Sequence, residues 1–210
     1  MERIESITLK KMIQDERNHT LSDGLSQLPL PDKLKIGFKR FAIPKDMDEF
    51  SGAICYGQRM YLAEQETNDF GIILRSITGY YYPIVSKHSF LDEKAQLFGR
   101  VILHLPVIDL YPVAMHLVSL MAELTDREKK LLHREPSKQE KAAHIEKLAP
   151  FADLTALDFL RQSLNKTEEE VLLTPYNDCL VRFMLAKEQN AFNERLTEVY
   201  KKESESKHKS

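Results

Sequence analysis

From Pro44 onward, apolar side chains recur mainly at the three- and four-residue spacing that places them on one side of an α-helix. Each stretch that keeps this spacing between turn or capping signals is predicted to be helical. The predicted helices cover residues 46–63, 69–79, 89–103, 109–132, 137–148, 153–164, 167–173 and 176–202. The fourth would be shorter if residues 125–128 broke it. The last one has an early half that looks buried and a later half with only a sparse apolar stripe.

Local signals set the expected helix ends. Four segments match the capping box, in which Ser or Thr is followed three residues later by an acidic residue: Ser89 with Asp92, Thr125 with Glu128, Ser137 with Glu140, and Thr167 with Glu170. Gly79 stands where a C-terminal glycine is expected, and Pro112 falls in a first turn, where a missing N–H costs little. Other predicted starts are Asp46 or Asp48, one of residues 67–69, and Asp109.

A β-strand is predicted just before this helical region. Apolar residues at 34, 36, 38, 41 and 43 alternate with polar ones, with a slip in phase after Phe38, and Pro44 ends the pattern. A single strand leaves backbone groups unpaired and therefore needs a partner. The partner strand could be formed by residues 4–10 or by residues 80–85 of the same chain, or it could come from another subunit.

These elements predict a mainly α fold, an irregular multi-helix bundle with a small N-terminal β element. The expected organisation is an N-terminal arm with short strands over residues 1–43, a helical domain over 44–202 and a charged tail, disordered in isolation, over 203–210. No repeat of fixed period is visible, which favours a bundle over a solenoid.

The amino-acid composition is that of a globular protein. Of 210 residues, 42% are hydrophobic and 30% charged, as in a globular protein that needs no metal or disulfide to fold. Cys55 and Cys179 are therefore expected to be reduced, packed thiols. The net charge of −2 disfavours a general nucleic-acid binder. No apolar run reaches the roughly 20 residues that span a bilayer, so the expected location is the cytoplasm, with a bacterial cell favoured.

Local catalytic motifs are missing from the sequence. It contains no pair of His residues at zinc-protease spacing, no phosphate-binding loop, no dinucleotide-binding glycine pattern and no serine-hydrolase elbow. His104 and His116 lie in apolar segments, where a core role is favoured over metal ligation. Residues 168–170, three successive glutamates, fit the first turn of a helix, where negative charge is favourable. No catalytic, metal-binding or cofactor-binding residue is predicted.

Two groups of residues are predicted to bind a partner. Leu25, Leu28 and Leu30 belong to a Pro- and Gly-containing segment, residues 19–31, that interrupts regular structure and is expected to dock on something. The second group is Tyr80, Tyr81 and Tyr82, which precede a proline. Three successive aromatics in an extended segment cannot all face one core, so at least one is expected at a surface. A structural role is the alternative.

Three segments carry a resemblance to a known class of proteins. They read IPKDMDEFSGAICYGQRMYL from residue 43, NDFGIILRSITGYYYP from residue 68 and EEEVLLTPYNDCLVRF from residue 168. Together they resemble tail assembly chaperones of tailed phages and related morphogenesis proteins. The resemblance covers about 60 residues, and the leucine segment has no counterpart in it. It implies a helical protein without a catalytic site that binds other virion or assembly proteins, with self-association as a further option, and that is found in the cytoplasm or the virion.

Three functional hypotheses follow. The leading one is a non-enzymatic interaction protein of phage or prophage assembly. The second is an enzyme whose site is assembled from residues distant in sequence. The third is a bacterial cytoplasmic regulator or nucleic-acid adaptor with a local basic patch of Lys10, Lys11, Lys33, Lys35, Lys39 and Arg40.

Overall fold

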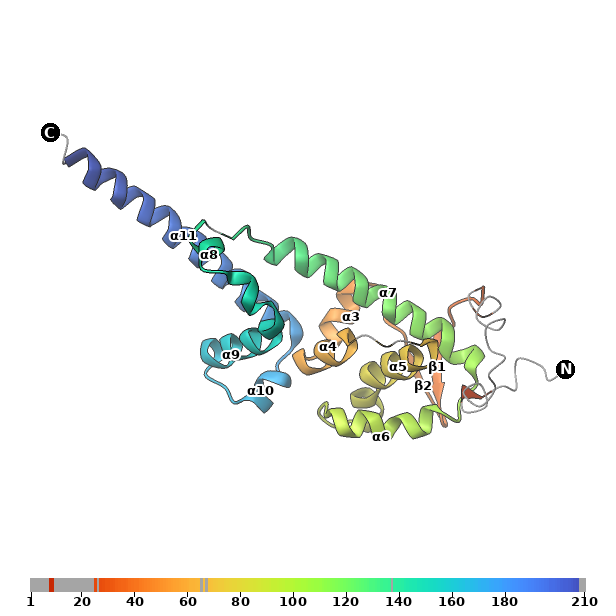
Figure 1. The fold of residues 1–210 in the computed structure, drawn as a ribbon. Helices are drawn as coiled ribbons and strands as arrows, with labels where there is room; N and C mark the ends of the chain where they lie inside the picture. Colours follow the sequence, from red (N-terminus) through yellow and green to blue (C-terminus); the bar gives the residue numbers. More distant parts are fainter. Residues whose placement is uncertain are drawn as a thin grey trace. The chain divides into compact units, whose positions relative to one another are not determined.

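The structure is a computed structural model, and it describes residues 8–9, 25, 27–64, 66, 68–136 and 138–207. The predicted fold class is confirmed: the fold is mainly α, with a small two-stranded sheet near the N-terminus (Figure 1). Most of residues 4–10, a candidate partner of the predicted strand, and part of the leucine segment, residues 19–24 and 26, lie outside the described residues. Near the N-terminus, Thr8 pairs with Pro106 in an isolated antiparallel bridge, and the backbone N–H of Leu9 donates to the carbonyl of Leu105.

The chain forms two compact units. The first comprises residues 1–125 and 172–176, and the second comprises residues 126–171 and 177–210. The boundary between them therefore falls inside helix α7, Val107–Leu132, and not after residue 43. Residues of the predicted arm belong to the first unit because the sheet packs on its helices.

The predicted strand is a β-hairpin. Strand β1, Lys33–Ile36, pairs antiparallel with β2, Lys39–Ala42, so the prediction of one strand pairing with residues 4–10 or 80–85 is wrong. The change of phase in the apolar pattern after Phe38 marks the turn between the two strands, which consists of Gly37 and Phe38. Gly37 has a φ of +61° and Phe38 does not have a positive φ, which together fit a two-residue type II′ turn.

The turn makes a prediction about Gly37. Replacing it by alanine is expected to lower the free energy of unfolding by about 1–2 kcal/mol, because a Cβ is disfavoured at positive φ. No atom lies within 4 Å of the new Cβ, so the cost arises in the backbone alone. Gly52→Ala is the matched control, since Gly52 is also unobstructed but helical, and alanine should be neutral or favourable there. Equal urea midpoints for the two variants would contradict the turn assignment.

The predicted helix over residues 46–63 is two helices, α3 (Met47–Ala53) and α4 (Tyr56–Ala63). Asp46 caps α3 as expected, accepting the backbone N–H of Glu49 at 2.9 Å. The break at Ile54 and Cys55 coincides with backbone hydrogen bonds to residues 174–176. A long-range pairing has therefore replaced the helical hydrogen bonds that local spacing favours.

Helix α5, Asp69–Ser86, is the centre of the first unit. Asn68 caps it, accepting the N–H of Gly71 at 2.7 Å. The predicted end at Gly79 is wrong, because the helix continues through Pro83 and ends at Lys87 in a left-handed conformation. Gly79 instead permits close packing: a Cβ there would lie 2.8 Å from both Leu62 and Tyr61.

Two further helices complete the first unit. Helix α6, Asp92–Ile102, begins after Leu91, so Ser89 does not cap it. Helix α7 begins two residues before Asp109 and contains Pro112, and it runs through Thr125 without a break. The Thr125 hydroxyl donates to the carbonyl of Met121 and so forms no capping box.

The second unit consists of short helices and one long helix. In order they are α8 (Lys138–Ala142), the 3-10 helix η3 (Ile145–Phe151), α9 (Ala152–Leu164), α10 (Glu168–Leu172) and α11 (Tyr176–Lys207). The predicted helix over 137–148 is thus split, and its proposed cap at Ser137 lies outside the described residues. The Thr167–Glu170 box is confirmed by reciprocal hydrogen bonds. Helix α11 includes residues 203–207 of the predicted tail.

Candidate functional site

A short strand-like pairing joins two parts of the first unit that are far apart in the sequence. The N–H of Tyr56 donates to the carbonyl of Thr174 at 2.9 Å, and the N–H of Tyr176 donates to the carbonyl of Ile54 at 3.1 Å. Cys55 and Pro175 lie opposite each other in this antiparallel bridge. The segment before α11 is thereby held against the break between α3 and α4.

Gln58, in the first turn of α4, joins this bridge to α5. Its Oε1 accepts the N–H of Cys55 at 3.1 Å, and its Nε2 donates to the carbonyl of Gly79 at 2.8 Å. That carbonyl would normally accept from residue 83, but Pro83 has no N–H to give. The buried Gln58 amide therefore satisfies a backbone group that the proline leaves unpaired.

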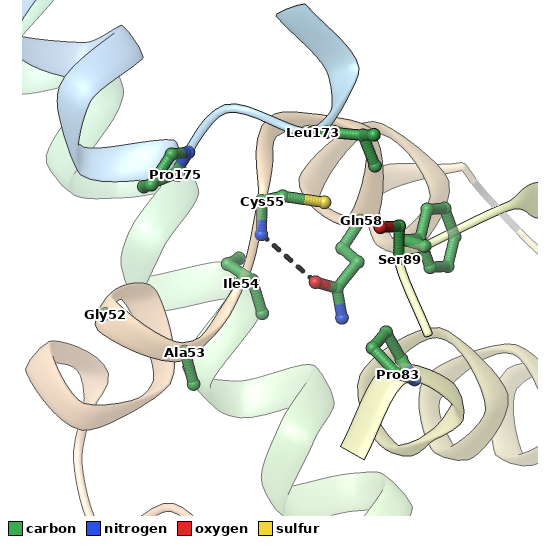
Figure 2. A pocket seen from close by; sticks show the side chains of 10 residues that line it. Gly52, Ala53, Ile54, Cys55, Gln58, Pro83, Ser89, Leu173 and Pro175 are labelled. Carbon is green, nitrogen blue, oxygen red and sulfur yellow. Dashed lines mark hydrogen bonds between the residues drawn. The ribbon is translucent and has the colours of Figure 1, made fainter. Parts of the chain in front are cut away.

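A cavity of about 260 Å³ lies beside this arrangement. Figure 2 shows its lining side chains and the hydrogen bond from Cys55 to Gln58. Burial raises the pKa of the Cys55 thiol, which disfavours the nucleophilic thiolate. Among the described residues that line the cavity there is no carboxylate, imidazole or amine, and most of them are apolar. It is lined by Gly52, Ala53, Ile54, Cys55, Gln58, Pro83, Ser89, Phe90, Leu173 and Pro175.

The predicted tyrosines are all buried, because they lie in a helix and not in an extended segment. Successive helical residues point about 100° apart, and each tyrosine meets a different element. Tyr80 stacks on Phe50 of α3 with ring centroids 5.5 Å apart, and Tyr82 lies 6.5 Å from Phe90. Tyr81 donates its hydroxyl to the carbonyl of Ala42 at 3.1 Å. The prediction that one of them reaches a surface is wrong.

The predicted leucines are divided between core and surface. Leu25 is 3% exposed, Leu28 is half-buried and Leu30 is 44% exposed. Leu25 therefore docks on the protein itself, and among the three only Leu30 offers a substantial apolar surface to a partner. Residues 21–24 and Ser26, which lie before and between them, are outside the described residues.

Sequence reasoning missed an apolar surface on α11. One face of this helix packs within the second unit: Phe183 stacks on Phe159 with ring centroids 5.5 Å apart, and the Lys187 amine donates to the carbonyl of Leu131 at 2.8 Å. Other large apolar side chains of the helix are exposed. We call four of them the outer stripe of α11: Val181, Leu185, Phe192 and Val199. The other two, Met184 and Tyr200, lie on either side of it.

The outer stripe lies on one side of α11, and the ion pair of Glu188 with Arg195, at 2.9 Å, lies between its members along the helix. At about 100° per residue, its four side chains lie within about 40° of one another around the helix, and Phe183 and Lys187 lie roughly opposite. The stripe runs for about 27 Å along the axis at 1.5 Å per residue. The signal was present in the sequence as spacings of four and seven residues, but it could not be separated from the buried face without knowing which side packs.

Neither a metal site nor a location is established. Within the part of the chain that the structure describes, no group of three or more His, Cys, Asp or Glu side chains is placed to hold a metal ion. The Nε2 atom of His116 lies 2.7 Å from the Pro44 carbonyl, a structural contact. Helix α7 is long and apolar enough to cross a membrane by length and composition, although Asp109 and Glu123 interrupt its apolar residues. Half of that window is buried, and the core helix of a soluble protein passes the same test.

Comparison with known proteins gives no family assignment. No family model, no curated protein and no solved structure matches the chain.

Proposed function

We propose that this chain is a non-enzymatic interaction protein that binds another protein through the outer stripe of α11. The observation that carries the proposal is the exposure of this stripe, including Phe192 at 55%. Single exposed apolar residues are normal on a protein surface, whereas exposed apolar residues aligned along one side of a helix are typical of a helix that binds another helix or a groove. The stripe is long and narrow, and it fits the apolar face of a partner helix.

The class of partner is proposed from the resemblance of residues 43–62, 68–83 and 168–183 to phage tail assembly chaperones. The partner would then be a virion or virion-assembly protein in the cytoplasm of an infected or lysogenic bacterium. The second unit supports this role, because further exposed apolar side chains lie on η3 and α9. These are Leu148, Phe151 and Leu154.

A capture experiment tests this proposal. The full chain, tagged and expressed at native level in its source cells, is isolated and its partners are quantified by mass spectrometry. We expect a stoichiometric partner whose recovery falls at least about tenfold when Leu185 and Phe192 are both changed to serine, because removing two apolar anchors costs more than the roughly 1.4 kcal/mol of a tenfold change.

The matched control places the same change on another helix. Leu97 and Val101 of α6 are also exposed, and the Leu97→Ser, Val101→Ser variant should keep the partner. Recovery of the wild-type chain alone, or equal loss of the partner from both variants, would contradict the α11 interface. A partner unrelated to virions would retain the interface but contradict the assembly role.

A further inference from the structure

The β-hairpin and the residues after it carry a strong local charge. Residues 33–45 contain five basic side chains, Lys33, Lys35, Lys39, Arg40 and Lys45, and no acidic one, giving +5. The whole chain has a net charge of −2, so the remainder carries −2 − 5 = −7. Residues 33–45 are therefore a basic segment in an otherwise acidic protein. The net charge of the whole chain does not reveal this segment.

The strand register gathers three of these cations on one face. Lys35 lies directly opposite Arg40, and Lys33 lies two residues along the same strand, so all three project from the exposed face, while Leu34 and Ile36 are buried beneath it. Like charges directly opposite each other destabilise a strand pair. Within the described part of the chain, no ion pair neutralises Lys33, Lys35 or Arg40.

An open recess of about 510 Å³ adjoins these cations. Its lining holds Lys33, Lys35 and Arg40 together with two carboxylates, so its formal charge is 3 − 2 = +1. The hairpin is held firmly from behind, because Tyr81 hydrogen-bonds Ala42 at 3.1 Å. The recess is lined by Pro31, Asp32, Lys33, Lys35, Arg40 and Asp109.

The tip of the hairpin carries an unusual aromatic residue. Phe38, in the turn, is 106% exposed, so no other part of the protein covers its ring. Between residues 33 and 45, all of which the structure describes, it is the one exposed large apolar side chain. The hairpin thus presents an uncovered aromatic ring next to three exposed cations.

We propose that this hairpin binds single-stranded nucleic acid, with the phosphates along Lys33, Lys35 and Arg40 and an unpaired base on Phe38. Cations that follow the backbone and an aromatic side chain that stacks on a base are the two elements of sequence-tolerant single-strand binding. A duplex offers no unpaired base, and its second strand would bring more phosphates towards a protein whose remainder is acidic. An anionic membrane would require a larger apolar face than one phenyl ring. This inference does not depend on the α11 interface.

Fluorescence anisotropy with a labelled oligothymidylate of about 20 nucleotides tests the proposal on the full chain. Binding is expected at about 50 mM salt and should weaken steeply by about 200 mM. The Lys35→Ala, Arg40→Ala variant should bind at least about tenfold more weakly, and the slope of log K against log salt should fall by about 1.4, at roughly 0.7 for each phosphate that the variant no longer neutralises. Phe38→Ala should weaken binding about tenfold with an unchanged slope.

The control removes the same charge elsewhere. Lys130 and Lys202 are exposed, and their double replacement by alanine should change affinity less than about twofold. Retained circular dichroism shows that the hairpin variants are folded. The proposal is overturned by an absence of binding at about 50 mM salt, or by equal decreases in affinity for the hairpin and control variants. It is also overturned if polyglutamate or anionic lipid vesicles compete as strongly as the oligonucleotide, which would assign the hairpin to an acidic peptide or a membrane.

Discussion

Replacing Tyr81 by alanine is expected to lower the free energy of unfolding by about 3–5 kcal/mol, the usual cost of deleting a large buried aromatic side chain. The side chain is 0% exposed. Its ring lies edge-on to Tyr80 at 4.9 Å and to Phe41 of the hairpin at 6.4 Å between centroids. Its loss would leave a cavity where α5 supports the sheet. Urea denaturation followed by circular dichroism measures the change.

Two controls separate the causes of this destabilisation. Tyr81→Phe keeps the ring and removes only the hydrogen bond to Ala42, so it should cost about 1 kcal/mol. Tyr200→Ala removes the same side chain from an exposed position on α11 and should change stability by less than about 0.5 kcal/mol. If Tyr81→Ala and Tyr200→Ala had similar effects, Tyr81 could not be a core residue of the first unit.

The hairpin shows what local pattern can predict and where it stops. The alternation of apolar and polar residues correctly located extended structure at residues 33–42, and the slip in phase recorded the turn. The residue that allows the turn, Gly37, was itself visible in the sequence. The error lay in treating a change of phase as an irregularity of one strand, although Gly followed by any residue is a known two-residue hairpin turn.

Other errors came from tertiary contacts that local spacing does not contain. The caps at Asp46 and Asn68 depend on residues within three positions, and each was among the predicted alternatives. The break at Ile54 and Cys55 depends on residue 175, more than a hundred positions away. Helix-forming spacing continues through the break, although Gly52 and Gly57, on either side of it, are weak points of the predicted helix.

The candidate binding surfaces also depend on tertiary contacts that the local sequence pattern does not contain. Aromatic residues in succession suggested an exposed contact site, but an α-helix surrounded by other elements can bury all three tyrosines in different directions. Conversely, the sparse apolar stripe of α11 looked like the weak end of a helix and is an exposed face. Burial is a property of the neighbours of a helix, and these are set by the whole chain.

Replacing Gln58 by leucine is expected to lower the free energy of unfolding by about 3 kcal/mol. Leucine has nearly the same shape, but it leaves two backbone groups without their partners, the buried Gly79 carbonyl and the partly buried Cys55 N–H. Each unsatisfied buried group costs about 1–3 kcal/mol. The same substitution at the exposed Gln189 of α11 should change stability by less than about 0.5 kcal/mol.

Pro83 provides a sharper test, because the need for Gln58 arises from the missing N–H of this proline. With Pro83→Ala, the alanine N–H can donate to the Gly79 carbonyl through the ordinary helical hydrogen bond. Gln58→Leu should then cost about 1–2 kcal/mol less than it does with Pro83 present, leaving mainly the unpaired N–H of Cys55. Urea denaturation of the four chains in this double-mutant cycle measures the coupling. Additive effects would show that the Gln58 amide does not compensate for the proline, whereas coupling of the expected sign would explain how α5 retains a proline in its interior.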